Sequence, residues 1–456
     1  MANFSKSNVP QFSVDVYQNE YLPEGGREVN AIVTVTATGG GTIGSAVTAP
    51  HLYAPGKGPD AAVAIMVDCS GSMDYPPTKM RNAREATAAA IDTLRDGVHF
   101  AVIGGTHVAK EVYPGGGRLA VADATTRGQA KQALRRLSAG GGTAIGTWLR
   151  LADRLLSSAD VSIRHGILLT DGRNEHESPD ALKATLDACA GRFTCDARGV
   201  GTDWEVKEVT GIASALLGTA DIVADPAALA ADFTQMMETA MGKEVADVAL
   251  RLWTPVGTEI AFVKQVAPTV EDLTARRVEA GPRAGDYPTG SWGDESRDYH
   301  VCVRVPAANI GQEMLAARVS LVIPQAGGAS AESGGGSAQS LGVQGLVRAV
   351  WTDDMAASTS INPQVAHYTG QAELAQVIQQ GLDLRKEGDF DGATAKLGRA
   401  VQLANASGNA DTAKLLAKVV DVVDAATGTV RLKAKVAEAD EMTLETRSTK
   451  TVRVKK

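Results

Sequence analysis

Short apolar runs alternate with longer amphipathic stretches throughout residues 61–241. The runs have the length and continuous hydrophobicity of strands buried on both faces of a sheet, and they cover residues 63–67, 99–103, 163–170, 193–200 and 220–223. The stretches between them have the apolar period of a helix, and they cover residues 79–94, 126–137, 145–157, 179–190, 205–216 and 226–241. This alternation predicts an α/β fold with a mostly parallel sheet covered by helices.

In the segments on both sides of this region, apolar residues recur with a different period. Residues 11–17, residues 28–36 and several short segments between residues 248 and 351 alternate apolar with polar side chains, which indicates strands with one buried face. Because the two flanks share this period, we expect them to form one antiparallel β-sandwich into which the α/β domain is inserted. The ends of an inserted domain lie close together, so the arrangement needs no long connection.

Helical periodicity returns in residues 371–426, where apolar residues form three successive helical faces. The turn at residues 388–393 resembles that of a tetratricopeptide-type (TPR-like) hairpin, and a small helical bundle is an equally good interpretation. The last ten residues contain five basic residues and no acidic one, so we expect a disordered tail. The predicted N-terminal β segment, α/β domain, β-sandwich, helical segment and basic, threonine-rich tail are residues 1–60, 61–242, 243–360, 361–427 and 428–456.

Charge and composition argue against several classes of function. The 456 residues carry a formal net charge of −8, and the isoelectric point is near 5.5, which argues against non-specific binding to nucleic acid. The N-terminus lacks the basic and apolar segments of a secretion signal, and no apolar run is long enough to cross a membrane. The four cysteines lack the close pairs of a zinc site, which indicates reduced thiols. We therefore expect a cytoplasmic protein that binds neither nucleic acid nor a membrane.

Side chains that carry oxygen atoms stand at the ends of predicted strands and before a predicted helix. Asp68, Ser70 and Ser72 come directly after the first predicted strand. Asp171 follows the third strand, and Thr143 stands after three glycines that let the backbone approach a ligand closely. The carboxyl ends of parallel strands meet at one edge of a sheet, where ligands bind in open α/β folds. We expect these five side chains to lie close together at that edge.

This set of donors suits a hard divalent cation. Mg²⁺ prefers oxygen ligands in near-octahedral geometry and keeps several waters. Two carboxylates roughly neutralise the ion, and three hydroxyls add oxygen ligands without further negative charge. Such an ion stays electrophilic, so a carboxylate of another molecule can complete its coordination shell. The pattern therefore favours recognition of an acidic group over ion storage, for which more anionic ligands are typical.

These residues resemble the metal-ion-dependent adhesion site (MIDAS) of the von Willebrand factor A (vWA) family, whose pattern is Asp-x-Ser-x-Ser with a later Thr and a later Asp. The resemblance covers residues 61–241 and fills all five positions in order. It implies a doubly wound, Rossmann-like sheet. By this resemblance, Ser70, Ser72 and Thr143 bind Mg²⁺ or Mn²⁺ directly, and Asp68 and Asp171 act directly or through water.

The resemblance also implies what binds at the site. In this family a protein partner commonly supplies an Asp or Glu side chain to the metal. The flanking segments look like those of intracellular bacterial members, some of which are similar to proteins encoded with kinases, phosphatases or phosphopeptide-binding domains. That similarity places the predicted partner in bacterial kinase or phosphopeptide signalling.

We interpret the chain as a metal-dependent scaffold for protein interactions rather than an enzyme. The sequence contains neither a nucleophile elbow nor a phosphate-binding loop of the Walker type. His176 lies in the loop after Asp171, where a solvated side chain is a better interpretation than a metal ligand. Two alternatives stay open. The chain could be a non-catalytic subunit of an ATPase or chelatase-type assembly, or the metal could be structural, with the C-terminal helices binding the partner.

Four threonines lie near basic residues of the predicted tail: Thr443, Thr446, Thr449 and Thr451. In a mobile tail a Ser/Thr kinase could reach them, and a phosphothreonine reader could bind the product. The alternative is a charged tail that only keeps the protein in solution.

Overall fold

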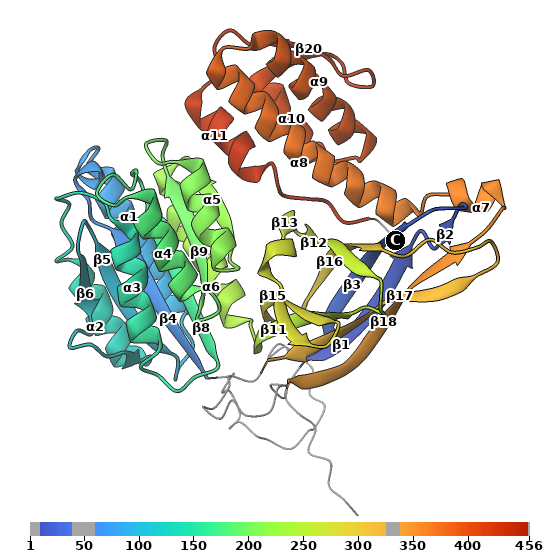
Figure 1. Cartoon of the computed structure of the whole chain (residues 1–456). Coiled ribbons are helices and arrows are strands. Elements are labelled where there is room, and N and C mark those ends of the chain that lie inside the picture. Colours follow the sequence, from blue (N-terminus) through green and yellow to red (C-terminus); the bar gives the residue numbers. More distant parts are fainter. Residues whose placement is uncertain (1–9, 39–59, 325–337, 455–456) are drawn as a thin grey trace, which may run out of the picture. The chain divides into compact units, whose positions relative to one another are not determined.

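The computed structural model describes residues 10–38, 60–324 and 338–454, and Figure 1 shows the elements in chain order. The chain forms two compact units. The first unit contains residues 60–246 and 290–294. The second unit contains residues 11–38, 247–289 and 295–454. The second unit therefore combines strands from both sides of the first unit in the sequence with the C-terminal helices.

The first unit is built on a seven-stranded sheet with the order β10-β9-β8-β4-β5-β6, in which β7 also pairs with β5. The strands are β4 (Ala61–Asp68), β5 (His99–Gly105), β6 (Ala109–Tyr113), β7 (Ala120–Val121), β8 (Ile163–Thr170), β9 (Thr194–Val200) and β10 (Ala220–Val223). All pairs from β10 to β5 are parallel, and β6 and β7 run antiparallel to β5. Because β5 lies on one side of β4 and β8 on the other, the strand order reverses at β4, which is where open α/β sheets bind ligands.

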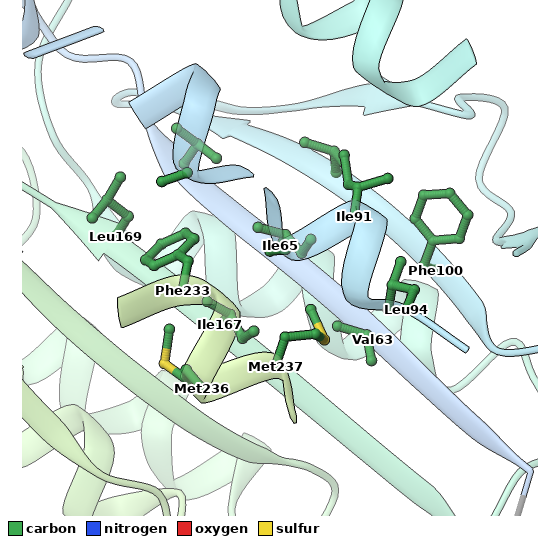
Figure 2. Close-up of a cluster of buried hydrophobic side chains, with 14 of the residues drawn as sticks. Val63, Ile65, Ile91, Leu94, Phe100, Ile167, Leu169, Phe233, Met236 and Met237 are labelled. Atoms are coloured by element: carbon green, nitrogen blue, oxygen red, sulfur yellow. The ribbon is translucent and has the colours of Figure 1, made fainter. Parts of the chain in front are cut away.

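Helices cover this sheet. They are α1 (Thr78–Thr93), α2 (Ala124–Leu134), α3 (Ile145–Leu156), α4 (Pro179–Cys189), α5 (Val206–Ala215) and α6 (Leu229–Met241), with the short 3₁₀ helices η1 (Gly71–Asp74) and η2 (Pro226–Ala228). Every residue of β4 is buried, because the strand lies in the middle of the sheet and is covered on both faces. Val63 and Ile65 contribute to a core with α1 and α6, in which Ile91, Phe233 and Met237 are fully buried, as Figure 2 shows. The predicted doubly wound α/β fold is confirmed.

The sandwich of the second unit contains two sheets. The first has the order β1 (Gln11–Gln18), β3 (Glu28–Thr38), β16 (Glu295–Arg304), β12 (Glu259–Ala267) and β13 (Glu271–Asp272). The second has the order β14 (Val278–Gly281), β15 (Ala284–Trp292), β11 (Val245–Trp253), β17 (Glu313–Ile323), β18 (Gln339–Trp351) and β2 (Tyr21–Leu22). Both sheets are antiparallel, except that the edge strand β2 pairs in parallel with β18. The sheets face each other closely, since a Cβ atom on Gly345 of β18 would lie 2.5 Å from Cγ2 of Val16 on β1.

The predicted insertion is also present. Strand β3 precedes the α/β unit in the sequence and pairs along ten residues with β16, which follows it, from Glu28 opposite Arg304 to Ala37 opposite Glu295. The α/β unit is thus an insertion in a β-sandwich that the two flanks build together.

The C-terminal part begins with α7 (Met355–Thr359), α8 (Pro363–Glu387), α9 (Phe390–Ala406) and α10 (Ala410–Val419). Helices α8 and α9 form a hairpin that turns at Gly388, whose φ of 85° is left-handed. Gly381 allows close packing within it, because a Cβ atom there would lie 2.8 Å from Cγ of Leu397. The hairpin is therefore TPR-like, but in the described residues it is followed by α10, a β-hairpin and one further helix rather than by a second helical hairpin.

Residues 428–454 are folded, which corrects the expectation of a disordered tail for the part of it that the structure describes. They form β20 (Thr429–Leu432), which pairs with β19 (Val420–Asp424), and then α11 (Glu438–Arg447). Contacts with α8 explain this order: Lys386 forms an ion pair of 2.8 Å with buried Glu445, and Nε2 of Gln379 donates to the Glu445 carbonyl. Polar tertiary contacts of this kind produce no periodic pattern of apolar residues, so the sequence did not indicate this helix.

Residues 449–454, here called the C-terminal strap, lie along the sandwich. The Val270 N–H donates to the Thr449 carbonyl at 2.8 Å, and the Thr451 N–H donates to the Pro268 carbonyl at 2.9 Å. In the part of the chain that the structure describes, no helix is both long and apolar enough to span a bilayer.

Candidate metal centre

The carboxyl ends of β4 and β8 bring three loops together at the point where the strand order reverses. Asp68 is the last residue of β4, and Asp171 directly follows β8. The loop before α3, which carries Thr143, is held against the loop after β4, because the Gly71 N–H donates to the Gly141 carbonyl at 2.9 Å. We call Asp68, Ser70, Ser72, Thr143 and Asp171 the oxygen cluster.

Four members of the oxygen cluster are joined by hydrogen bonds. The Ser70 N–H donates to Oδ1 of Asp68 at 2.7 Å, and the hydroxyls of Ser70 and Ser72 lie 2.9 Å apart. The Ser72 hydroxyl donates to Oδ1 of Asp171 at 2.7 Å. Both predicted carboxylates and both predicted serines therefore lie within one connected group.

Thr143 is the fifth member and lies beside this group. A Cβ atom on Gly172 would lie 3.1 Å from the Ser72 hydroxyl and 3.8 Å from the Thr143 hydroxyl, so the two hydroxyls approach the same point. Thr143 is buried, and its backbone is fixed by the His176 N–H, which donates to the Thr143 carbonyl at 2.9 Å. The structure thus brings all five predicted residues together.

His176 supports the threonine loop, a role that the sequence pattern did not reveal. Its Nδ1 lies 3.3 Å from the backbone nitrogen of Thr143, and a Cβ atom on Gly142 would lie 2.1 Å from its ring. The ring centroid of His107 is 6.3 Å away, and both imidazoles are exposed. The glycine at position 142 is therefore required because the imidazole occupies the space of a side chain.

Two further residues contact the cluster and were missed in the sequence. Thr170 donates its hydroxyl to Oδ2 of Asp68 at 2.7 Å. Lys79 on α1 places Nζ 2.7 Å from Oδ2 of Asp171 and 3.3 Å from Oδ2 of Asp203. The sequence of α1 did indicate that Lys79 is buried, since Lys79 is in helical register with the buried residues Ala83 and Ala86.

Burial dominates the electrostatics of the cluster. Asp68 and Asp171 are both fully buried. Burial raises the pKa of Asp68 to about 6, with a smaller contribution from the charge of Asp171, while hydrogen bonds from Ser70 and Thr170 oppose the rise. Burial by itself would lower the pKa of Lys79, but its hydrogen bond and ion pair with Asp171 raise that pKa above the ordinary value.

The donor chemistry fits a hard divalent cation. Asp68 is a buried carboxylate that accepts hydrogen bonds from two neutral groups, the Ser70 N–H and the Thr170 hydroxyl. A cation beside it would therefore offset the free-energy cost of burying its negative charge. Within residues 10–38, 60–324 and 338–454, no group of three or more His, Cys, Asp or Glu side chains is arranged to hold a metal. A cation at this position would thus depend on hydroxyl oxygens, as magnesium or manganese can.

Comparisons with known proteins agree with this geometry. A family model described as von Willebrand factor type A domain matches residues 61–222, and a model described as von Willebrand factor type A C-terminal domain matches residues 402–448. A solved structure described as von Willebrand factor type A from Catenulispora acidiphila is 52% identical, with 100% of this chain and 99% of that chain covered and a TM-score of 0.89.

A second solved structure shares the fold at low identity. It is described as the ArnB paralog VWA2 from Sulfolobus acidocaldarius and is 14% identical, with 96% of this chain and 98% of that chain covered and a TM-score of 0.56. The comparison with curated proteins yields no match. The two structural matches extend over nearly the whole chain, so the sandwich and the C-terminal helices belong to the shared architecture.

Proposed function

The chain belongs to the von Willebrand factor type A family, whose members commonly mediate metal-dependent protein interactions, and we propose that this chain binds a protein partner in that way. An Asp or Glu side chain of the partner is the group that we expect the oxygen cluster to capture with the help of a divalent cation. Domains of this family are generally interaction modules rather than enzymes, and a binding role without catalysis is part of the proposal.

The residues of the oxygen cluster divide into two kinds of donor. Ser70, Ser72 and Thr143 would hold Mg²⁺ or Mn²⁺ through hydroxyl oxygens, with Asp68 and Asp171 contributing directly or through water. A bound divalent cation supplies a Lewis-acidic position for a carboxylate. The hydrogen bonds of Ser70 and Thr170 to Asp68 hold that carboxylate in place before any ligand arrives.

One observation carries the proposal: a buried pair of carboxylates lies directly behind an exposed serine. Asp68 and Asp171 are inaccessible, whereas Ser72, Gly140 and Gly141 are exposed. A small cation among these groups would be held from the buried side and reached from the solvent side. This arrangement suits recognition of a ligand from another molecule, because a storage site would enclose the ion.

Substitution of Thr143 tests the proposal without a change of charge. We expect Thr143→Ala to weaken Mn²⁺ binding by about tenfold, because one of three neutral donors is lost while the buried carboxylates remain. Calorimetric titration of the full chain with MnCl₂ measures the affinity. Thr78→Ala, at an exposed position on α1, is the matched control and should bind Mn²⁺ as the wild type does.

The binding role needs a second measurement with a protein partner. Complexes captured by cross-linking in native lysate should disappear with EDTA and with Thr143→Ala, and persist with Thr78→Ala. Equal Mn²⁺ affinity of wild type and Thr143→Ala, or complexes that survive EDTA, would contradict the proposal. Turnover of nucleotides or phosphoesters that depends on Thr143 would instead indicate an enzyme.

A further inference from the structure

A buried lysine lies against the oxygen cluster. The side chain of Lys79 is 9% exposed, and its Nζ donates to Oδ2 of Asp171 at 2.7 Å and lies 3.4 Å from the Ser72 carbonyl. The same Asp171 accepts the Ser72 hydroxyl on its other oxygen. The ammonium group therefore contacts two members of the oxygen cluster from its buried side.

Packing alone does not explain a lysine at this position. Its neighbours in helical register on α1 are Ala83 and Ala86, both buried, so an apolar side chain would suit the helix better. Lysine is rarely this deeply buried unless its charge is paired. The pairing with Asp171 identifies the cluster as the reason for the charge.

The charges of the buried groups can be summed. Asp68 and Asp171 contribute −2 and Lys79 contributes +1, which gives −1. A divalent cation changes this sum to +1, and one carboxylate from a ligand then brings it to zero. Asp203, which also approaches Lys79, is 68% exposed on its side chain, so water screens its charge.

We propose that Lys79 is a built-in counter-ion that couples metal binding to ligand binding at the oxygen cluster. This inference rests on the proposed function and adds its regulation. Lys79 neutralises Asp171 in the metal-free protein and opposes the entry of a cation by charge repulsion. It then leaves the loaded site with one positive charge in excess, which an anionic ligand neutralises. Metal and acidic partner therefore bind cooperatively, and each strengthens the other by the same factor.

Lys79→Met is the main test, because methionine keeps most of the length of the side chain and removes its charge. We expect Mn²⁺ to bind the Lys79→Met protein at least about tenfold more tightly than the wild type in chloride buffer, since one positive charge near the cation is gone. Lys79→Arg retains the charge and should stay within about threefold of the wild type. Calorimetric titration of the full chain with MnCl₂ gives each affinity.

Acetate serves as the carboxylate probe for the coupling. At equal ionic strength, replacement of chloride by acetate should raise the Mn²⁺ affinity of the wild type, and it should have little effect on Lys79→Met, whose loaded site is already neutral. An equal response of the two proteins to acetate would overturn the inference. Equal Mn²⁺ affinity in chloride would overturn it as well.

A purely structural role for Lys79 predicts a different result. Loss of a packing group would lower the melting temperature of Lys79→Met equally with and without Mn²⁺. The counter-ion role predicts a larger rise of the melting temperature on addition of Mn²⁺ in Lys79→Met than in wild type, because the buried Asp171 is unpaired until a cation arrives. This readout also applies if the metal-free variant folds only when Mn²⁺ is added.

Asp203→Asn provides an independent variant at an exposed position. It removes a negative charge near Lys79, so Mn²⁺ should bind about two- to threefold more weakly, opposite in sign to Lys79→Met. Stronger binding in Asp203→Asn would contradict the inference. Failure of the proposed function is distinguishable from these outcomes, because then the wild type itself would bind no Mn²⁺ and Thr143→Ala would change nothing.

Discussion

His300 on β16 links stability to pH at the scale of a single residue. It is buried against the edge of the Phe262 ring, at a centroid distance of 4.9 Å, and its Nε2 lies 2.9 Å from Oδ1 of Asn30. Burial lowers the pKa of His300 to about 4, with a smaller contribution from the charge of Lys264. The folded protein therefore keeps this imidazole neutral at pH values where the unfolded chain protonates it.

The sign of the effect follows from the depressed pKa. The contribution of neutral His300 is fully present above about pH 6.5 and is lost as the pH falls toward 4, by up to about 3 kcal/mol. His300→Gln cannot protonate, so we expect its free energy of unfolding to fall less between pH 7 and pH 4.5 than that of the wild type. Urea unfolding of the full chain at both pH values measures this. Parallel curves for the two proteins would show that His300 is not responsible.

The oxygen cluster shows how far single residues can be predicted. Its five members were found because each stands at the end of a predicted strand or before a predicted helix, and their types follow a known pattern. Thr170 and Lys79 escaped because their roles depend on contacts with Asp68 and Asp171 across the fold. Lys79 did carry a local signal, a charged residue on the apolar side of α1, and buried charges of this kind indicate function when they adjoin a site.

At the scale of elements, one glycine determines how closely a C-terminal helix packs against a neighbouring turn. A Cβ atom on Gly398 of α9 would lie 2.4 Å from the carbonyl oxygen of Gly428, in the turn between β19 and β20. The helix and the turn therefore meet backbone against backbone. Gly370 on α8, by contrast, has no atom within 4 Å of a Cβ position.

These two glycines predict opposite effects of the same substitution. Gly398→Ala should destabilise the chain by about 1–3 kcal/mol, because the turn must move to admit the methyl group. Gly370→Ala, the matched control, should stabilise it by about 0.5–1 kcal/mol through its helix propensity. Urea unfolding measures both changes, and hydrogen exchange should place the loss for Gly398→Ala in α9 and β20. A Gly398→Ala protein as stable as the wild type would refute the close contact.

The elements differ in how well the sequence predicts them. The strands of the α/β unit are recognisable because burial on both faces produces continuous apolar runs, as in β4, where all eight residues are buried. Helix α11 was missed because few apolar residues anchor it. Its Glu445, and Ser448 at its C-terminal end, are buried and contact α8 through hydrogen bonds and an ion pair, which composition and period do not reveal.

At the scale of the whole molecule, the joining of the two flanks in one sandwich was predicted, and the course of the C-terminal residues up to residue 454 was not. The insertion could be predicted because segments far apart in the sequence share the same alternation of apolar and polar side chains. The strap has no period, and its backbone instead bonds to the segment after β12. The folded state of α11 and of the strap affects the predicted kinase sites. Thr446 on α11 is buried, and the hydroxyl of Thr451 on the strap donates to the Val266 carbonyl at 2.6 Å. Modification of either threonine would require α11 or the strap to detach first.

Asp298 on β16 connects three segments of the second unit. It is 2% exposed and accepts hydrogen bonds from the Thr34 hydroxyl on β3, at 2.6 Å, and from the Tyr368 hydroxyl on α8. Arg453 of the strap donates to both carboxylate oxygens, each at 2.9 Å. A buried carboxylate thus holds the sandwich, the first long C-terminal helix and the strap at one point.

Removal of the guanidinium tests this connection. Arg453→Met leaves the Asp298 charge buried with hydroxyl donors only, and since the arginine side chain is 43% exposed, water replaces part of the lost interaction. We expect a loss of about 1–3 kcal/mol and faster hydrogen exchange in the strap. Arg431→Met, at an exposed position on β20, is the matched control. If Arg453 acts through Asp298, adding Asp298→Asn to Arg453→Met should cost less than Asp298→Asn does alone. Effects that simply add, or an unchanged exchange rate in the strap, would show that the strap is held by its backbone bonds.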